Sequence, residues 1–255
     1  MNLLAFFAHP DDETMLAGGT LALLAQCGFQ VHYLCATRGE GGELGEPPLC
    51  SRDELGQLRE GELVCAVQKL GVRSLTFLGY ADPVIGPGEE LYAYTDNLTL
   101  LAGQVTASIR QFEAVALLTH GSNGEYGHPA HVLSYQAARV AVESLGEAAP
   151  LLYTVQGNFP AHPRPRLANK DDLAHLVIDI LPALARKEAA ALCHRSQHAL
   201  FVRRASQEAG RQLSVPEVLM RLESLHRKFP PVNGVCQDLI AEALKPWLVS
   251  TGQDL

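Results

Sequence analysis

The stretch LLAFFAHPDDE at residues 3–13 determines how the chain is organised. Residues 3–8 are apolar throughout, which is typical of a buried parallel strand, and ligands gather at the carboxyl ends of such strands. His9 and Asp12, three residues apart just past this strand, can converge on one cation, and zinc takes N and O ligands of this kind. Asp11 would then stay free as a general base. For an isolated HPDDE, an ordinary turn is an equally good explanation, so other stretches must decide.

Composition restricts the class of protein. The chain has 255 residues, 47% apolar and 19% charged, which is ordinary for a soluble globular protein. The net charge of −8 without any Lys/Arg run argues against nucleic acid or an anionic membrane as the main partner. We find no signal peptide and no stretch of about 18 apolar residues that would span a bilayer. These features indicate a cytoplasmic protein whose partner is a small molecule, with a homo-oligomer left open.

The cysteines show no CxxC motif and no close pairing. We therefore expect small buried side chains in a reducing compartment rather than a disulfide framework. The six residues are Cys27, Cys35, Cys50, Cys65, Cys193 and Cys236.

Strand-like and helix-like segments alternate along the chain, which predicts a mainly parallel sheet with helices on both faces. We expect strands at 3–8, 29–36, 72–78, 114–119, 151–155 and 175–180. We expect helices at 14–28, 51–70, 96–112, 129–145, 181–194, 214–229 and 239–248. The prediction is one Rossmann-like α/β domain over residues 1–255, with its core in about 1–200 and a helical extension at about 205–255.

A second polar stretch, HGSNGEYGHPAH, occupies residues 120–131 after the expected fourth long strand. Its glycines indicate a loop, and Pro129 suits the first turn of a helix. His128 would then cap this helix and His131 would lie in its first turn, three residues on and on the same side. Together with His9 and Asp12, His131 would complete three metal ligands and leave a fourth position open, as catalytic zinc sites do.

Two loops are candidates to border this site, 37–50 (TRGEGGELGEPPLC) and 158–166 (NFPAHPRPR). The first is Gly-rich, but the G-x-G-x-x-G pattern from Gly39 fails at Leu44, and the loop follows the second strand. A dinucleotide-binding role is therefore disfavoured.

The chain resembles the PIG-L/LmbE-like family of zinc-dependent N-acetylglucosamine deacetylases. AHPDDE at 8–13 and YGHPAHV at 126–132 are similar to its two signature stretches. TRGEGG at 37–42, RxxEL at 59–63, FLGYAD at 77–82 and KEAAALCHRSQ at 187–197 add similarity in the same order. The likeness covers about the first 200 residues and implies a Rossmann-like fold that removes an N-acetyl group from a glucosamine-containing molecule.

The resemblance also implies roles for particular residues. His9, Asp12 and His131 would hold zinc, or another divalent metal, and Asp11 would be the general base. His128 would stabilise the developing oxyanion as an imidazolium, assisted by Tyr126. Arg59 and Asp82 are expected to contact sugar hydroxyls, although surface salt bridges explain them nearly as well. These last four residues complete the predicted site.

One departure from the family pattern concerns His128. The second signature usually reads HPDH, whereas Ala130 stands here in place of the aspartate. Without that carboxylate, we expect His128 to be less easily protonated.

Three functions remain open. The first is a zinc-dependent deacetylase acting on an N-acetylglucosaminyl conjugate, such as one used in low-molecular-weight thiol biosynthesis. The second is a zinc amidase for a larger acyl or thiol-conjugate amide. The third, a metal-binding or nucleotide-binding module without hydrolysis, fits poorly, because Asp11 stays free beside a ligand and G-x-G-x-x-G is missing.

Overall fold

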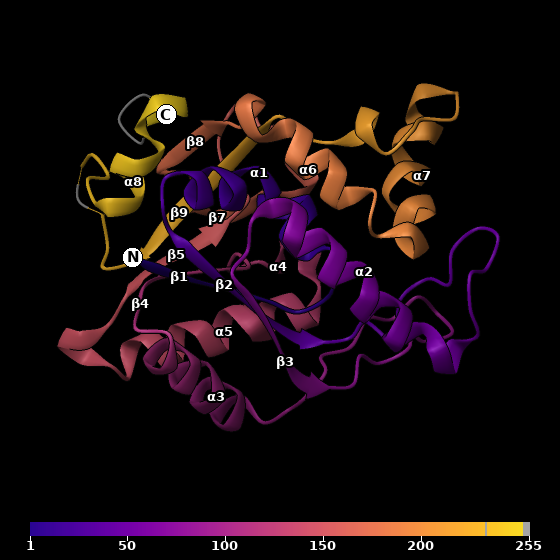
Figure 1. Ribbon diagram of the computed structural model, residues 1–255, viewed down its shortest axis with the longest axis horizontal. Coiled ribbons are helices and arrows are strands. Elements are labelled where there is room, and N and C mark those ends of the chain that lie inside the picture. The colour runs from indigo at the N-terminus through magenta and orange to yellow at the C-terminus, as the bar shows by residue number, and fades with distance from the viewer. Residues whose placement is uncertain (233, 252–255) are drawn as a thin grey trace.

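The computed structural model describes residues 1–232 and 234–251, and an eight-stranded sheet forms its centre (Figure 1). The strand order is β10-β8-β9-β5-β4-β1-β2-β3. Five strands are parallel: β1 (Asn2–Phe7), β2 (Gln30–Thr37), β3 (Ser74–Tyr80), β4 (Ala114–Thr119) and β5 (Leu151–Val155). Three are antiparallel to their neighbours: β8 (Leu176–Asp179), β9 (Leu222–Phe229) and β10 (Leu248–Thr251). The mainly parallel α/β sheet that the sequence predicts is confirmed.

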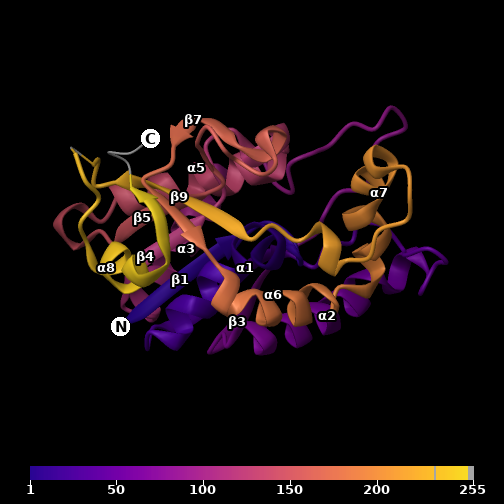
Figure 2. The same cartoon turned by 90° about the horizontal axis from the view of Figure 1, so that it is seen from above.

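Helices cover both faces of the sheet (Figures 1 and 2). One face carries α1 (Asp12–Gln26), α2 (Leu55–Leu70) and α6 (Leu184–Ala191), and the other carries α3 (Leu98–Gln111) and α5 (Pro129–Glu143). Because side chains alternate along a strand, Leu3 and Phe7 of β1 join the first apolar core, whereas Leu4 and Phe6 join the second. The apolar run at the start of the chain is therefore a strand buried on both faces. No helix among the described residues is long and apolar enough to cross a membrane.

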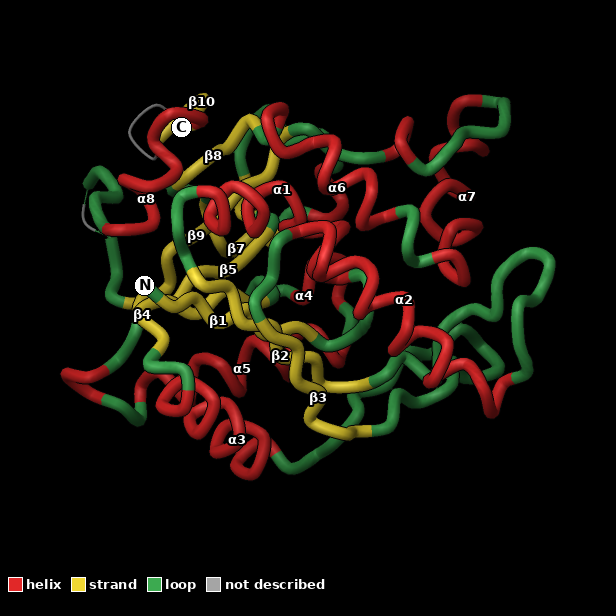
Figure 3. The backbone as a smooth tube through the Cα atoms, in the orientation of Figure 1, coloured by secondary structure: helices red, strands yellow, loops and turns green. Residues whose placement is uncertain are grey.

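Further helices and strands lie outside these two layers. They are α4 (Gly124–Gly127), α7 (His198–Ala209), α8 (Leu239–Leu244), and the paired strands β6 (Gly157–Asn158) and β7 (Asn169–Leu173). Figure 3 shows long loops between the regular elements around α7 and the amino-terminal end of α2.

The expected helix at 214–229 is wrong, because its second half forms β9 between β5 and β8. LESLHRKF has a helix-like composition, but pairing with strands on both sides outweighs this local preference. Glu223 contributes to this outcome, since its carboxylate is buried against Lys187 at 2.7 Å. The expected helix at 239–248 ends as α8 at Leu244, and β10 follows, so the extension is not purely helical. Residues 252–255 of that extension lie outside the described residues.

The cysteine expectation is wrong for one pair. Cys65 on α2 and Cys193, just after α6, form a disulfide across 128 residues of sequence. Cys27, Cys35, Cys50 and Cys236 are free. Since disulfides are rare in reducing compartments, this bond does not fit the reducing compartment expected from the cysteine pattern.

Candidate active site

A cavity of about 420 Å³ lies at the carboxyl ends of the parallel strands. In the sheet β1 lies between β4 and β2, so the chain leaves β1 in one direction and later returns on its other side as β4. Ligand sites in open α/β sheets form at such a reversal of strand order. All eight residues that the sequence singles out line this one cavity: His9, Asp11, Asp12, Arg59, Asp82, Tyr126, His128 and His131.

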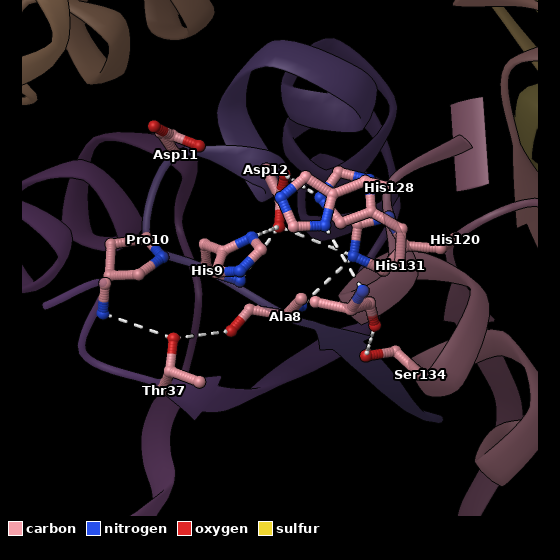
Figure 4. Close-up of polar contacts among 12 residues, drawn as sticks. Ala8, His9, Pro10, Asp11, Asp12, Thr37, His120, His128, His131 and Ser134 are labelled. Atoms are coloured by element: carbon pink, nitrogen blue, oxygen red, sulfur yellow. Dashed lines mark hydrogen bonds and ion pairs between the residues drawn. The ribbon is translucent and has the colours of Figure 1, made fainter. Parts of the chain in front are cut away.

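Asp12 is the centre of the candidate metal site (Figure 4). One carboxylate oxygen lies 3.4 Å from Nδ1 of His9, and the other lies 3.4 Å from Nε2 of His131. The backbone N–H of His9 donates to Asp12 at 2.8 Å and so fixes the carboxylate at the start of α1. Nε2 of His131 is buried and has no hydrogen-bond partner among the described residues. An unpaired buried nitrogen is costly, and a cation bound beside Asp12 would satisfy it.

Carboxylates on the far side of each imidazole orient the two histidines. Nδ1 of His131 lies 2.6 Å from Glu125, and Nε2 of His9 lies 3.2 Å from Asp82. A proton held on these nitrogens leaves the other nitrogen of each ring, the one facing Asp12, as a lone-pair donor. Histidine ligands in metalloproteins are typically supported in this way.

The charges around the two rings also suit a cation. Burial and the neighbouring His120 lower the pKa of His131, which favours the neutral ring that a metal requires. Burial opposes protonation of His9, but Asp12 and Asp82 outweigh it and raise the pKa of this ring to about 10. The carboxylates around the two rings therefore attract positive charge, which a bound cation would supply.

Glu125 and His120 are buried members of the cluster that the sequence reasoning missed. His120 places Nδ1 3.0 Å from Glu125 and accepts the backbone N–H of Ala8 at Nε2. Glu125 has a left-handed backbone with φ of 58°, which is unfavourable for a side chain of this type. The signal for Glu125 was available, because a carboxylate near His131 is what an orienting partner requires. His120 of HGSNGE gave no signal of its own beyond its residue type.

Two overlapping groups therefore bring three possible ligand atoms within 4.8 Å of one another. They are His9, His128 and His131, and Asp12, His120 and His131. His131 belongs to both groups, which makes it the ligand best supported by the geometry.

The side chain of Asp11 lies apart from the imidazole cluster (Figure 4). Its carboxylate faces Arg59 instead. Nη2 of Arg59 donates to Asp11 at 3.0 Å, and Nη1 donates to the carbonyl of Gly39 at 2.8 Å. A Cβ at Gly39 or Gly42 would overlap the guanidinium, which explains why the loop is Gly-rich here. Burial raises the pKa of Asp11 to about 7, although Arg59 acts in the opposite direction. A carboxylate with this pKa can exchange a proton near neutral pH.

The backbone of Asp11 is held in a strained conformation by Glu13. Asp11 has φ of 103°, and its N–H donates to Glu13 at 2.9 Å. The other oxygen of Glu13 lies 2.9 Å from Nε2 of His194, and both side chains are fully buried. His194 belongs to the 187–197 segment, and its contact with Glu13 could not be read from the sequence.

His128 caps α5, as the sequence predicts. Its Nδ1 accepts the backbone N–H of Ala130 at 3.2 Å, so the neutral ring carries its proton on Nε2. Burial, together with His131 and His9, lowers the pKa of His128 to about 3. At this pKa the ring is neutral at neutral pH, in line with the expectation that His128 is not easily protonated, and its role at a developing oxyanion stays a prediction. The side chain of Tyr126 is 56% exposed, with its ring 5.7 Å from that of His128.

Asp82 and Arg59 have partners within the protein. Besides His9, Asp82 accepts the backbone N–H of Gly41 at 3.3 Å, and Arg59 holds Asp11. Both line the cavity, and their contact with sugar hydroxyls stays a prediction.

Comparison with known proteins gives consistent matches over the first part of the chain. The sequence profile of a family described as "PIG-L: GlcNAc-PI de-N-acetylase" matches residues 4–142. A 1D-myo-inositol 2-acetamido-2-deoxy-alpha-D-glucopyranoside deacetylase from Streptomyces avermitilis is 39% identical over 160 residues, covering 58% of this chain and 53% of that protein. Deacetylase 3 of the same description, from Catenulispora acidiphila, is 37% identical over 166 residues, which cover 58% of this chain and 46% of that protein. The chain therefore spans about half the length of these relatives.

Solved structures share the fold. GalB, a 4-carboxy-2-hydroxymuconate hydratase from Pseudomonas putida, superimposes with a TM-score of 0.61 at 21% identity, covering 92% of this chain and 99% of that one. The teicoplanin deacetylase Orf2 superimposes with a TM-score of 0.60 at 16% identity, covering 90% of this chain and 100% of that one. A hydratase and a deacetylase are thus similar to the same chain, so the fold alone does not identify the reaction.

Proposed function

The chain belongs to the PIG-L family, and from this premise we propose that it is a metal-dependent deacetylase that hydrolyses the N-acetyl group of an N-acetylglucosaminyl conjugate. One observation carries the proposal. Within the described residues, a buried cluster of imidazoles and Asp12 leaves His131 Nε2 without a hydrogen-bond partner, and a separate carboxylate, Asp11, lines the same cavity. The names of the Streptomyces and Catenulispora relatives favour a small glucosaminide as substrate. We propose that this substrate serves low-molecular-weight thiol biosynthesis.

We infer that the metal is zinc, held by His9, Asp12 and His131. Two imidazoles and one carboxylate are a donor set that zinc commonly takes in catalytic sites. When bound, zinc supplies Lewis acidity, which polarises an amide carbonyl and makes a water molecule more acidic. Glu125 and Asp82 keep the two rings oriented with their free nitrogens towards Asp12.

The chain's own groups then carry the protons. Asp11 takes a proton from the attacking water at its carboxylate and later delivers one to the departing amine. Arg59 and Glu13 hold Asp11 in place through its side chain and its backbone. His128 presents Nε2–H as a donor to the carbonyl oxygen as negative charge develops there, and Tyr126 assists at the exposed side.

The test is release of free amine by zinc-loaded protein from a panel of amides. The panel contains N-acetylglucosamine, its inositol and malate conjugates, and an amide with a longer acyl group. We expect release from an N-acetyl compound, and we expect Asp11→Asn to lower kcat by about 10³-fold while about one metal per chain stays bound. Asp53→Asn, at an exposed aspartate, is the matched control and keeps full activity.

Two outcomes would change this assignment. Release only from the longer acyl amide would favour the amidase alternative. Absence of release from every compound by the metal-loaded protein would contradict the proposed hydrolysis.

A further inference from the structure

One wall of the candidate active-site cavity is positively charged, although the chain as a whole carries a net charge of −8. Arg164 and Arg166 line this wall, from the segment between β6 and β7. Arg164 is partly buried and donates to the carbonyl of Val218, which fixes its position, whereas Arg166 is exposed. Neither residue has a role in the proposed hydrolysis.

The two guanidinium groups have no acidic partner among the residues that the structure describes. Within the described part of the chain, no carboxylate forms an ion pair with Arg164 or Arg166. Glu208, whose charge acts on both, is already paired with Arg204 at 2.8 Å. Two neighbouring positive charges repel each other, and an anionic ligand placed between them would relieve that repulsion. Guanidinium groups also bind carboxylate and phosphate oxygens through paired, charge-assisted hydrogen bonds.

The same cavity has an apolar wall beside the arginines. It is lined by Met15, Leu167, Leu200, Phe201 and Met220. Leu200, on α7, is 47% exposed. The hydroxyl groups of an inositol ring can accept hydrogen bonds from the arginines, but they neither balance the two positive charges nor cover this apolar surface. A group that is apolar and carries a negative charge would match both.

We propose that the part of the substrate attached to the glucosamine carries a carboxylate or phosphate bound by Arg164 and Arg166. An apolar portion of the same group packs on Leu200 and Phe201. This inference rests on the proposed deacetylase function and names its substrate class, an acidic and partly apolar N-acetylglucosaminide. The two arginines act in specificity, outside the bond-breaking chemistry.

The experiment compares three glycosides of N-acetylglucosamine that differ in one group. They carry a 4-carboxybenzyl group, its methyl ester, or a 4-phosphonobenzyl group. For the zinc-loaded protein we expect kcat/KM to be about tenfold higher for one of the acids than for the ester, with the difference in KM. The better of the two acids identifies the anion. The double variant R164Q/R166Q should bring the ratio of acid to ester close to one, whereas R139Q, at an exposed arginine outside the cavity, should keep it.

Equal kcat/KM for acids and ester in the unmodified protein would overturn the inference, as would an unchanged ratio in a double variant that unfolds at the same temperature. In both cases deacetylation of the ester would leave the proposed function standing. If no glycoside is deacetylated, the proposed function fails. The inference is then tested separately by measuring, with calorimetry, the affinity of each glycoside for the zinc-loaded Asp11→Asn variant. About tenfold tighter binding of an acid than of the ester supports the arginine site, and equal affinities reject it.

Discussion

The sheet has a parallel half, β1 to β5, and an antiparallel half, β9, β8 and β10. The two halves differ in the residues that they contribute to the candidate active site. The loops after β1 and β3 contribute His9 and Asp82 to the candidate active site, and the first turn of α5, which follows β4, contributes His131. The antiparallel half contributes Met220, just before β9, to the cavity wall. The family profile ends at residue 142, before β5 begins. We infer that the parallel half carries the chemistry shared with the family, while the antiparallel half supports it.

The two halves are joined by the buried carboxylate of Glu223, which bonds to α1 and forms an ion pair with Lys187. Glu223 of β9 accepts the backbone N–H groups of Gly19 and Thr20 in α1, at 2.9 and 2.7 Å, and binds Lys187 of α6 at 2.7 Å. The antiparallel half therefore fixes the helix that begins with Asp12.

The largest expected effect comes from breaking this link. Lys187→Met leaves the buried carboxylate of Glu223 without its cation, and we expect the free energy of unfolding to fall by about 3–5 kcal/mol. Urea unfolding of the zinc-free protein measures the loss. Lys245→Met, at an exposed lysine paired with Glu242, is the control and should change it by less than about 0.5 kcal/mol. A loss below about 1 kcal/mol for Lys187→Met would show that the halves are not coupled through this pair.

The next largest effect concerns the parallel half, where Glu125 orients the proposed metal ligand His131. Glu125→Gln keeps an oxygen that can accept a hydrogen bond from Nδ1 of His131. It removes the negative charge that orients the imidazole ring and makes the other ring nitrogen more basic. We expect zinc affinity to weaken by about 10- to 100-fold, with little change in the secondary structure. Competition with a chelator of known affinity measures this. Glu143→Gln, on the exposed side of α5, is the matched control, and equal affinities for the two variants would rule out an orienting role for Glu125.

The candidate site was largely predictable because its main residues lie in two short stretches. Strand position and residue type place His9, Asp12 and His131 at one edge of the sheet, and all eight predicted residues line one cavity. The partners that orient them were not predictable, because each depends on tertiary contacts. His194, for example, meets Glu13 across 181 residues of sequence.

The fold shows the same division. Strands β1 to β5 have strong local patterns and were predicted, whereas β9 was predicted as a helix. The segment LESLHRKF becomes a strand because β5 and β8 offer hydrogen-bonding partners on both sides and because Glu223 finds Lys187. The disulfide between Cys65 and Cys193 has no local signal either. Local sequence therefore described the half that carries the proposed chemistry better than the half that supports it.

The smallest expected effect tests whether the antiparallel half acts on stability alone. Asp238 caps α8 and accepts hydrogen bonds from Tyr153 at 2.6 Å and from Arg227 of β9 at 2.7 Å. Burial alone would raise the pKa of Asp238, but the hydrogen bonds from Tyr153 and Arg227 help to outweigh it and lower the pKa below its ordinary value. Asp238→Asn should therefore reduce the free energy of unfolding by about 1–2 kcal/mol at pH 7.

The pH dependence of this loss identifies its cause. A carboxyl whose pKa is lowered by folding stabilises the protein fully above the unfolded pKa of about 3.9, and this contribution disappears as the pH falls through the folded value. The urea midpoints of the unmodified protein and of Asp238→Asn should therefore differ at pH 7 and converge as the pH falls below about 4. Asp96→Asn, at an exposed aspartate, is the control. A difference that persists unchanged at pH 3 would mean that shape rather than charge is responsible. A fall in kcat for Asp238→Asn at pH 7, where the variant is folded, would contradict the separation of the two halves, because Asp238 does not line the cavity.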